Sequence, residues 1–279
     1  MRSLLVSIAA SLLVAVPSAF CAEGDWKVPF NEGVAAADRG DWEAAAERLK
    51  EASKLDASRG ETWANLSTVY LQNKDLTNAV NSGERAVKTS PKMGAAYLAW
   101  GRALQAAGRS EDALKVFEDG AKADPSNADL QLTLGNVYGR QGNLNAARPA
   151  YEKAVAADPS NLYALSNLGY GYDEQGKTDR SLEYFLKATQ SAPGDEVAWF
   201  DLGAAYMKQK DAAKAIEAFS RSVRLKPTHY NANLSLALAY EEAGDLDRAS
   251  EFYVKSMSLT DDQKVKDAIL RQITRTGGK

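Results

Sequence analysis

Apolar and small residues recur along most of this chain with a period of 34 residues. Prolines mark one phase of the period, at 91, 125, 159, 193 and 227. Extending that phase in both directions gives seven units, which span 26–59, 60–93, 94–127, 128–161, 162–195, 196–229 and 230–263. In each unit, positions 4, 7, 8 and 11 fall on one stripe of a helix that turns about 100° per residue. The pattern therefore predicts an amphipathic helix in the first part of every unit.

Turn and capping residues predict a second helix in each unit. Position 15 is glycine in five units, where it can take the left-handed conformation that ends a helix: Gly40, Gly108, Gly142, Gly176 and Gly244. Position 16 follows with residues that cap a helix N-terminus: Asp41, Asp75, Asn143, Asp211 and Asp245. The proline at position 32 stops the second helix. Asn127, Asn161 and Asp195 can then cap the next unit.

The columns of the repeat resemble a known family. Position 7 is mostly leucine, position 8 is small, position 11 is mostly tyrosine, position 20 is mostly alanine and position 24 is aromatic. With proline at 32, this resembles the tetratricopeptide repeat (TPR) family. The resemblance implies an all-α solenoid, a right-handed superhelix of helix–turn–helix repeats, over residues 22–279. The aromatic residue at 11 fills space, while the small residue at 8 lets the second helix approach closely.

Three segments depart from the regular pattern. Pro29 and Glu32 occupy apolar positions of the first repeat, which predicts an irregular or frayed helix there. Pro149 falls within a second helix and predicts a kink. After the last repeat, apolar residues recur every four positions from Val265, which predicts a solvating cap helix over 264–275.

The N-terminal segment has the features of an export signal. Arg2 precedes a 13-residue apolar stretch over 4–16, too short for a membrane span and typical of a signal peptide. We expect a signal peptide over 1–21, cleaved after Cys21, and a mature chain without a transmembrane span. The expected location is the periplasm. An outer-membrane lipoprotein acylated on Cys21 and an extracellular protein are the alternatives.

Composition excludes several classes of chemistry. The chain has one Cys, one His and a net charge of -3, with no run of Lys and Arg. A disulfide within the chain needs two cysteines, and a structural zinc site usually needs four Cys or His ligands. A catalytic Ser–His pair would depend on His229, which we interpret as a cap or solvated turn residue. We therefore expect no enzyme activity, no cofactor, no metal and no nucleic-acid partner.

The candidate binding residues lie on the side of the first helices opposite the core stripe. In TPR proteins that side, positions 2, 5, 9, 12 and 13, lines the concave surface. The predicted partner-binding groove also includes Asn167 at position 6, and consists of Leu98, Arg102, Leu132, Asn136, Arg140, Tyr163, Asn167, Tyr170, Phe200, Met207, Lys208 and Leu238. Exposed aromatic groups often mark binding sites. The alternative is that Phe200, at position 5, and Tyr170 pack partly against the neighbouring repeat. Replacing Tyr170 by Ala should leave helicity and melting temperature nearly unchanged, whereas Tyr172→Ala should cost about 3 kcal/mol or more of stability.

One TPR activity does not fit these residues. TPR domains that grip the acidic C-terminus of cytosolic chaperones use two asparagines, matched here by Asn136 and Asn167. The cations of that site are missing, because Leu132, Val197 and Asp201 occupy their positions. A carboxylate would have no charge partner. The sequence instead predicts an exported, non-enzymatic scaffold that binds a protein or peptide in bacterial envelope assembly. The alternatives are a pilotin-like lipoprotein assembly factor and a polysaccharide-associated factor.

Overall fold

The structure is a computed structural model that describes residues 25–276. This part of the chain is all-α and contains 15 helices joined by short turns. Two helices come from each predicted repeat, and one follows the last repeat. In chain order they are α1 (Lys27–Asp38), α2 (Trp42–Leu55), α3 (Gly60–Gln72), α4 (Leu76–Thr89), α5 (Gly94–Ala106), α6 (Ser110–Ala123), α7 (Ala128–Arg140), α8 (Leu144–Ala157), α9 (Leu162–Glu174), α10 (Thr178–Ser191), α11 (Glu196–Lys208), α12 (Ala212–Leu225), α13 (Tyr230–Glu242), α14 (Leu246–Ser258) and α15 (Gln263–Thr276).

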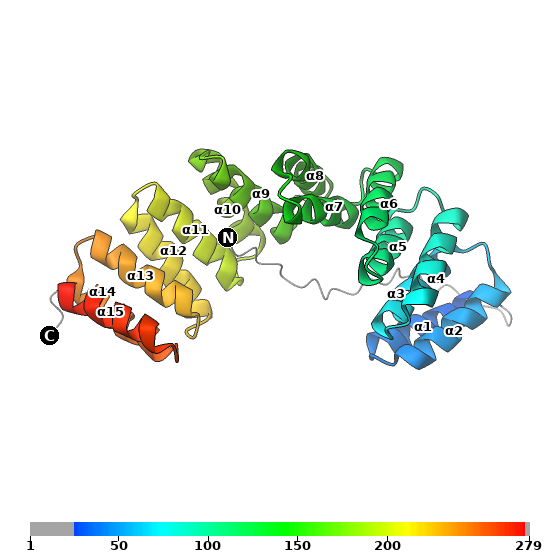
Figure 1. The fold of residues 1–279 in the computed structure, drawn as a ribbon, viewed down its shortest axis with the longest axis horizontal. Coiled ribbons are helices and arrows are strands. Elements are labelled where there is room, and N and C mark those ends of the chain that lie inside the picture. The colour runs from blue at the N-terminus through cyan, green and yellow to red at the C-terminus, as the bar shows by residue number, and fades with distance from the viewer. Residues whose placement is uncertain (1–24, 277–279) are drawn as a thin grey trace. The chain divides into compact units, whose positions relative to one another are not determined.

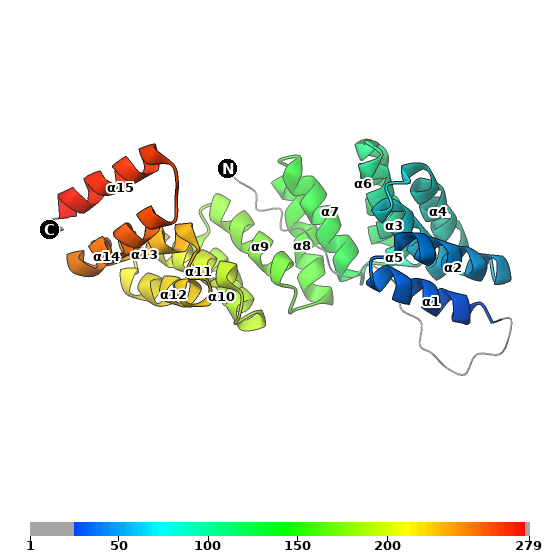
Figure 2. The same ribbon diagram turned by 90° about the horizontal axis from the view of Figure 1, so that it is seen from below.

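The described residues form two compact units. Unit 1 ends at Ala157 and holds α1–α8, and unit 2 begins at Asp158 and holds α9–α15. Within each unit the helices stack as consecutive pairs (Figures 1 and 2). We call the first helix of each repeat its A-helix and the second its B-helix. The predicted signal peptide and its cleavage site at Cys21 lie outside the described residues.

Turn geometry confirms the roles assigned to positions 15 and 16. The five glycines at position 15 all have positive φ, from 69° at Gly176 to 80° at Gly244. Lys74 and Lys210 occupy the same position in repeats 2 and 6 and adopt the same conformation, with φ of 60°. The capping residues also act as expected, since the side chain of Asp41, for example, accepts a hydrogen bond from the Ala44 N–H.

Small residues at position 8 let each A-helix approach its own B-helix. A Cβ atom built on Gly101 would lie 2.2 Å from a ring atom of Phe117, and one on Gly203 would lie 2.5 Å from Phe219. The aromatic ring at position 24 therefore fills the space that the missing side chain leaves. Both Phe117 and Phe219 are essentially unexposed, which places them in the cores of units 1 and 2.

The predicted irregularity of the first repeat is wrong. α1 is a continuous helix, and Pro29 lies in its first turn, where the missing N–H needs no partner within the helix. Phe30 is fully buried and anchors α1 in the core of unit 1. Pro149 lies inside α8 and does not end that helix.

The predicted cap helix is confirmed as α15. Ile269 and Ile273 are buried, and Val265 packs beside them against the core of unit 2. Figure 2 shows α15 in red after α14.

Candidate functional site

Three A-helices of unit 2, α9, α11 and α13, carry seven of the twelve predicted groove residues. We call positions 2, 5, 9, 12 and 13 of these helices the A-face of unit 2. Large apolar side chains are exposed there: Tyr163 at 36%, Tyr170 at 37% and Leu238 at 42%. Tyr163 makes no side-chain hydrogen bond among the described residues, so its contact surface is open to a partner.

Phe200 and Met207 contribute to the A-face but are half-buried. The ring of Phe200 lies 5.7 Å from that of Phe219 and 5.3 Å from that of His229, measured between centroids. Met207 packs against the same core. Phe200 therefore packs partly against its neighbours, which was the alternative for position 5.

His229 occupies the N-cap position of α13 but does not cap it. Its side chain makes no capping hydrogen bond, and its ring is half-buried against Phe200. Burial lowers the pKa of the imidazole, while the Glu196 carboxylate opposes that shift. The imidazole is thus a packing group, not a solvated turn residue.

Tyr170 is hydrogen-bonded to the neighbouring repeat. Its hydroxyl donates a hydrogen bond to Oδ1 of Asp201 at 2.5 Å, and its ring meets that of Phe185 edge-on at 5.2 Å. Position 9 therefore does not simply point away from the core, and the expectation that Tyr170→Ala leaves stability unchanged is not supported. From the sequence, Asp201 stands at a cation position of the chaperone-binding pattern and was expected near the binding strip, but its bond to Tyr170 was not predicted.

Asp201 is a buried carboxyl group without a cation. It is 3% exposed, and among the described residues Oδ2 has no hydrogen-bond partner. Burial raises the pKa of Asp201 to about 7, opposed by the hydrogen bond from Tyr170 and reinforced by the Asp195 carboxylate. Burial and the Asp201 carboxylate also raise the pKa of the Tyr170 phenol. The nearby Lys208 ammonium pairs with Asp173 instead.

Carboxylates dominate the charge of the A-face. Asp173, Glu174, Glu241 and Glu242 stand there against one cation, Lys208. Glu241 accepts hydrogen bonds from Tyr253 at 2.5 Å and from Arg275 at 2.7 Å. Glu174 and Glu242 are exposed. The A-face of unit 2 thus presents exposed apolar side chains with carboxylates beside them. Another molecule can contact both kinds of group.

An apolar cavity extends the A-face toward the cap helix. It has a volume of about 400 Å³ and lies between α13 and α15. Leu234 and Leu238 line it from α13, while Val265 and Ile269 line it from α15. The periodicity predicted a solvating role for α15 but gave no signal for this cavity.

The predicted residues of unit 1 form a poorer surface. Leu98 is 6% exposed and Leu132 is 1% exposed, so their assignment to an open groove is wrong: both pack inside unit 1. Asn136 accepts a hydrogen bond from Tyr151 at 3.0 Å. Arg102 is half-buried, and burial lowers its pKa, while Arg140 is exposed. Asn167 belongs to unit 2 and is half-buried.

No group of three or more His, Cys, Asp or Glu side chains in residues 25–276 is placed to hold a metal ion. Among the described helices, none combines the length and the apolarity that a membrane crossing requires.

Comparison with known proteins identifies the repeat. One sequence profile of the tetratricopeptide repeat family matches residues 30–93, 98–161, 132–196 and 166–230, and a second matches 206–263. Photosystem I assembly protein Ycf3 of Synechococcus sp. (strain CC9902) is 31% identical over 104 residues, which cover 34% of this chain and 60% of the relative. Small glutamine-rich tetratricopeptide repeat-containing protein 2 of Mycosarcoma maydis is 31% identical over 96 residues, covering 34% and 27%. The matches therefore span 60% or less of these two relatives.

Solved structures share the fold. MamA is 27% identical, with a TM-score of 0.54, and covers 57% of this chain and 93% of its own. YrrB, described as a TPR protein with an unusual peptide-binding site, is 23% identical with a TM-score of 0.55, covering 67% and 97%. The protein pilF of Pseudomonas aeruginosa is 16% identical with a TM-score of 0.64, covering 78% and 98%. With family profiles matched almost without interruption from residue 30 to residue 263, the chain belongs to the tetratricopeptide repeat family.

Proposed function

We propose that this protein is an exported, non-enzymatic scaffold that binds a peptide or protein segment on the A-face of unit 2, in the assembly of a bacterial cell envelope. The observation that carries the proposal is the exposure of Tyr163 and Tyr170 on α9 and of Leu238 on α13. Exposed apolar groups of this kind mark interaction sites. Aromatic side chains give a large contact area at a low cost in conformational entropy.

The known proteins support the same class of activity. Ycf3 is named as an assembly protein, and YrrB is described as having a peptide-binding site. Export is supported by the apolar stretch over 4–16 and by its flanking Arg2.

Site-specific photo-crosslinking in cells tests the binding face. A photoreactive phenylalanine analogue replaces Tyr163 or Leu238 on the A-face. The matched control replaces Val254, which is exposed at 50% on the B-helix α14. We expect a discrete crosslinked partner, identified by mass spectrometry, from the A-face positions but not from position 254. Equal crosslinking at all three positions, or none at the A-face, would contradict the proposed function.

Mass spectrometry of the N-terminus separates the two envelope alternatives. A mature chain that begins at Ala22 supports a free exported scaffold. A diacylated Cys21 supports a membrane-anchored assembly factor that uses the same A-face. An intact N-terminus in fractionated cells would overturn export while leaving the crosslinking result unaffected.

A further inference from the structure

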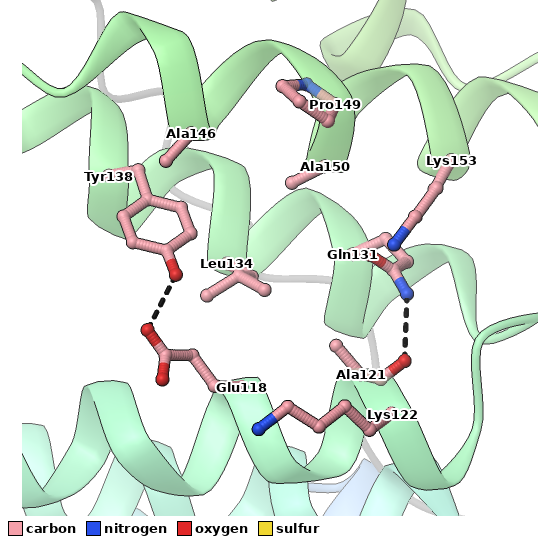
Figure 3. Close-up of a pocket in the computed structure, with 10 residues that line it drawn as sticks. All are labelled: Glu118, Ala121, Lys122, Gln131, Leu134, Tyr138, Ala146, Pro149, Ala150 and Lys153. Atoms are coloured by element: carbon pink, nitrogen blue, oxygen red, sulfur yellow. Dashed lines mark hydrogen bonds between the residues drawn. The ribbon is translucent and has the colours of Figure 1, made fainter.

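A second pocket opens inside unit 1, between α6, α7 and α8. It has a volume of about 400 Å³ and lies in repeat 4, against the last helix of repeat 3. Figure 3 shows Tyr138 and Glu118 at one end and Lys153 at the other, with Ala150 on the α8 wall between them. Tyr138 donates a hydrogen bond to Glu118 at 2.6 Å. The pocket therefore has an aromatic end, a cationic end and a small side chain in the middle.

Two other repeats fill the corresponding place with an aromatic ring of their own. Position 23, which is Ala150 in repeat 4, is Tyr184 in repeat 5 and Phe252 in repeat 7. The ring of Tyr184 stacks on Tyr172 with centroids 5.5 Å apart and planes 7° apart. The ring of Phe252 stacks on Tyr240 at 5.7 Å and 17°. Both stacking partners occupy position 11, which is Tyr138 in repeat 4.

A lysine ammonium also lies over each of these rings. At position 26, the Lys187 ammonium lies 5.1 Å from the Tyr184 centroid, and the Lys255 ammonium lies 5.7 Å from that of Phe252. A cation at this distance from an aromatic ring is attracted by the negative charge of the ring face. Lys153 is the residue at position 26 of repeat 4. Repeat 4 therefore keeps the tyrosine and the lysine but has no ring between them.

Repeats 2, 3 and 6 place an aromatic group at position 4 instead. Trp63, Tyr97 and Trp199 stand there in repeats 2, 3 and 6, and each donates a hydrogen bond to the carbonyl oxygen of position 32 in the preceding repeat. Repeat 4 has Gln131 at position 4. From repeat 2 to repeat 7, repeat 4 is the one that lacks an aromatic residue at both position 4 and position 23. Gln131 and Ala150, the residues at these two positions, both line the pocket.

We propose that this pocket receives an aromatic side chain of a partner protein, held between the Tyr138 ring and the Lys153 ammonium. Tyr184 and Phe252 show the geometry inside the same chain. A carboxylate accepts more than one hydrogen bond, so Glu118 can also receive an indole N–H or a phenol O–H. Tryptophan and tyrosine are thus favoured over phenylalanine. The pocket shares no residue with the A-face of unit 2, so this site and the proposed function can fail independently.

Titration with single-residue probes tests the pocket directly. The purified protein is titrated with N-acetyl-L-tryptophanamide, N-acetyl-L-tyrosinamide and N-acetyl-L-leucinamide, and the ring resonances of Tyr138 are followed by NMR. We expect saturable shifts with both aromatic amides and binding at least about tenfold weaker with the leucine amide. Equal binding of the three probes, or no shift up to their solubility limits, would overturn the proposal.

Variants test whether the chain can supply the missing ring. Ala150→Tyr copies repeat 5, so it should raise Tm and weaken probe binding at least about tenfold. Retained binding in a folded Ala150→Tyr protein would refute the site. Lys153→Gln keeps the cavity and Lys122 but removes the cation that faces the Tyr138 ring across the pocket, and should weaken binding about threefold or more. Lys115→Gln on the exposed side of α6 is its control and should leave binding unchanged. If Ala150→Tyr does not fold, unchanged probe binding by Lys153→Gln overturns the proposal.

Discussion

The hydroxyl of Tyr170 donates to Oδ1 of Asp201 at 2.5 Å and so joins α9 to α11 in unit 2. Asp201 is buried without a cation, and the Tyr170 ring also contacts Phe185. Tyr170 therefore contributes to two properties at once, the stability of unit 2 and the surface that the A-face offers a partner. Experiments on the A-face need to separate these two contributions.

Removing the Tyr170 hydroxyl tests its contribution to stability. Tyr170→Phe keeps the ring contact with Phe185 but leaves the Asp201 carboxyl without its hydrogen-bond donor. A buried acceptor that loses its partner costs about 1–3 kcal/mol, so the free energy of unfolding should fall by that amount in urea titrations. Tyr163→Phe is the control, because Tyr163 is exposed and should change stability by no more than about 0.5 kcal/mol. Equal effects of the two variants would show that the Tyr170 bond does not stabilise the fold.

The raised pKa of Asp201 predicts a pH-dependent stability. Burial raises this pKa from 3.8 to about 7, so between these values the folded protein binds a proton that the unfolded chain has released. The contribution of Asp201 to stability must then fall as pH rises from about 4 to about 7, and remain lower above that range. The expected loss is on the order of 2–4 kcal/mol.

Asp201→Asn isolates this effect from other titrating groups. Several carboxyl groups, such as Asp75 and Glu183, have lowered pKa values and stabilise the fold as pH rises through the acidic range. The measured quantity is therefore the difference in unfolding free energy between Asp201→Asn and the unchanged protein. That difference should grow in favour of Asp201→Asn between pH 5 and pH 8. A constant difference across this range would show that Asp201 titrates normally.

The sequence predicts local structure well because each signal acts within one repeat. The capping bond of Asp41 and the positive φ of Gly108 depend only on residues a few positions away. The same reasoning failed for Leu98 and Leu132, which are buried although position 5 lies opposite the core stripe. Whether the side chain at position 5 is buried depends on how the neighbouring A-helix packs against it. The spacing of apolar residues along a single helix carries no information about packing between helices.

The site was predictable to a smaller extent for the same reason. The exposure of Tyr163 and Leu238 follows from their helical positions. The bond between Tyr170 and Asp201 joins residues 31 positions apart and depends on the spacing between repeats. The repeat alignment holds a signal that could have revealed this bond. Asp201 stands at position 6 of its repeat, and that position faces position 9 of the preceding repeat, where Tyr170 lies.

The backbone conformation of Lys74 and Lys210 indicates that glycine at either position would stabilise the protein. Both adopt φ of 60°, a conformation that costs a residue with a side chain about 1–2 kcal/mol. Glycine removes that cost but gains entropy in the unfolded chain, so Lys74→Gly and Lys210→Gly should each stabilise by about 0.5–1 kcal/mol. Gly108→Lys is the reverse substitution and should destabilise the protein. At Gly108 φ is 76°, and an added Cβ atom would meet no other atom within 4 Å, so only the backbone conformation opposes the change. Thermal unfolding should show a higher Tm for the two glycine variants and a lower Tm for Gly108→Lys. A lower Tm for Lys74→Gly would contradict the argument.

Binding and stability separate most clearly at Tyr163 and Tyr172. Tyr163 is exposed at 36% on the A-face, whereas Tyr172 is half-buried and stacks on Tyr184 at 5.5 Å. Once the crosslinked partner is identified, Tyr163→Ala should weaken its binding by about tenfold, or 1.4 kcal/mol, with little change in Tm. Tyr172→Ala removes a stacked ring and should lower stability by about 3 kcal/mol. Calorimetric titration of the partner and urea unfolding measure the two effects on the same variants. If Tyr163→Ala lowers stability while Tyr172→Ala lowers only affinity, the partner contacts the opposite face of α9, and the A-face is not the binding surface.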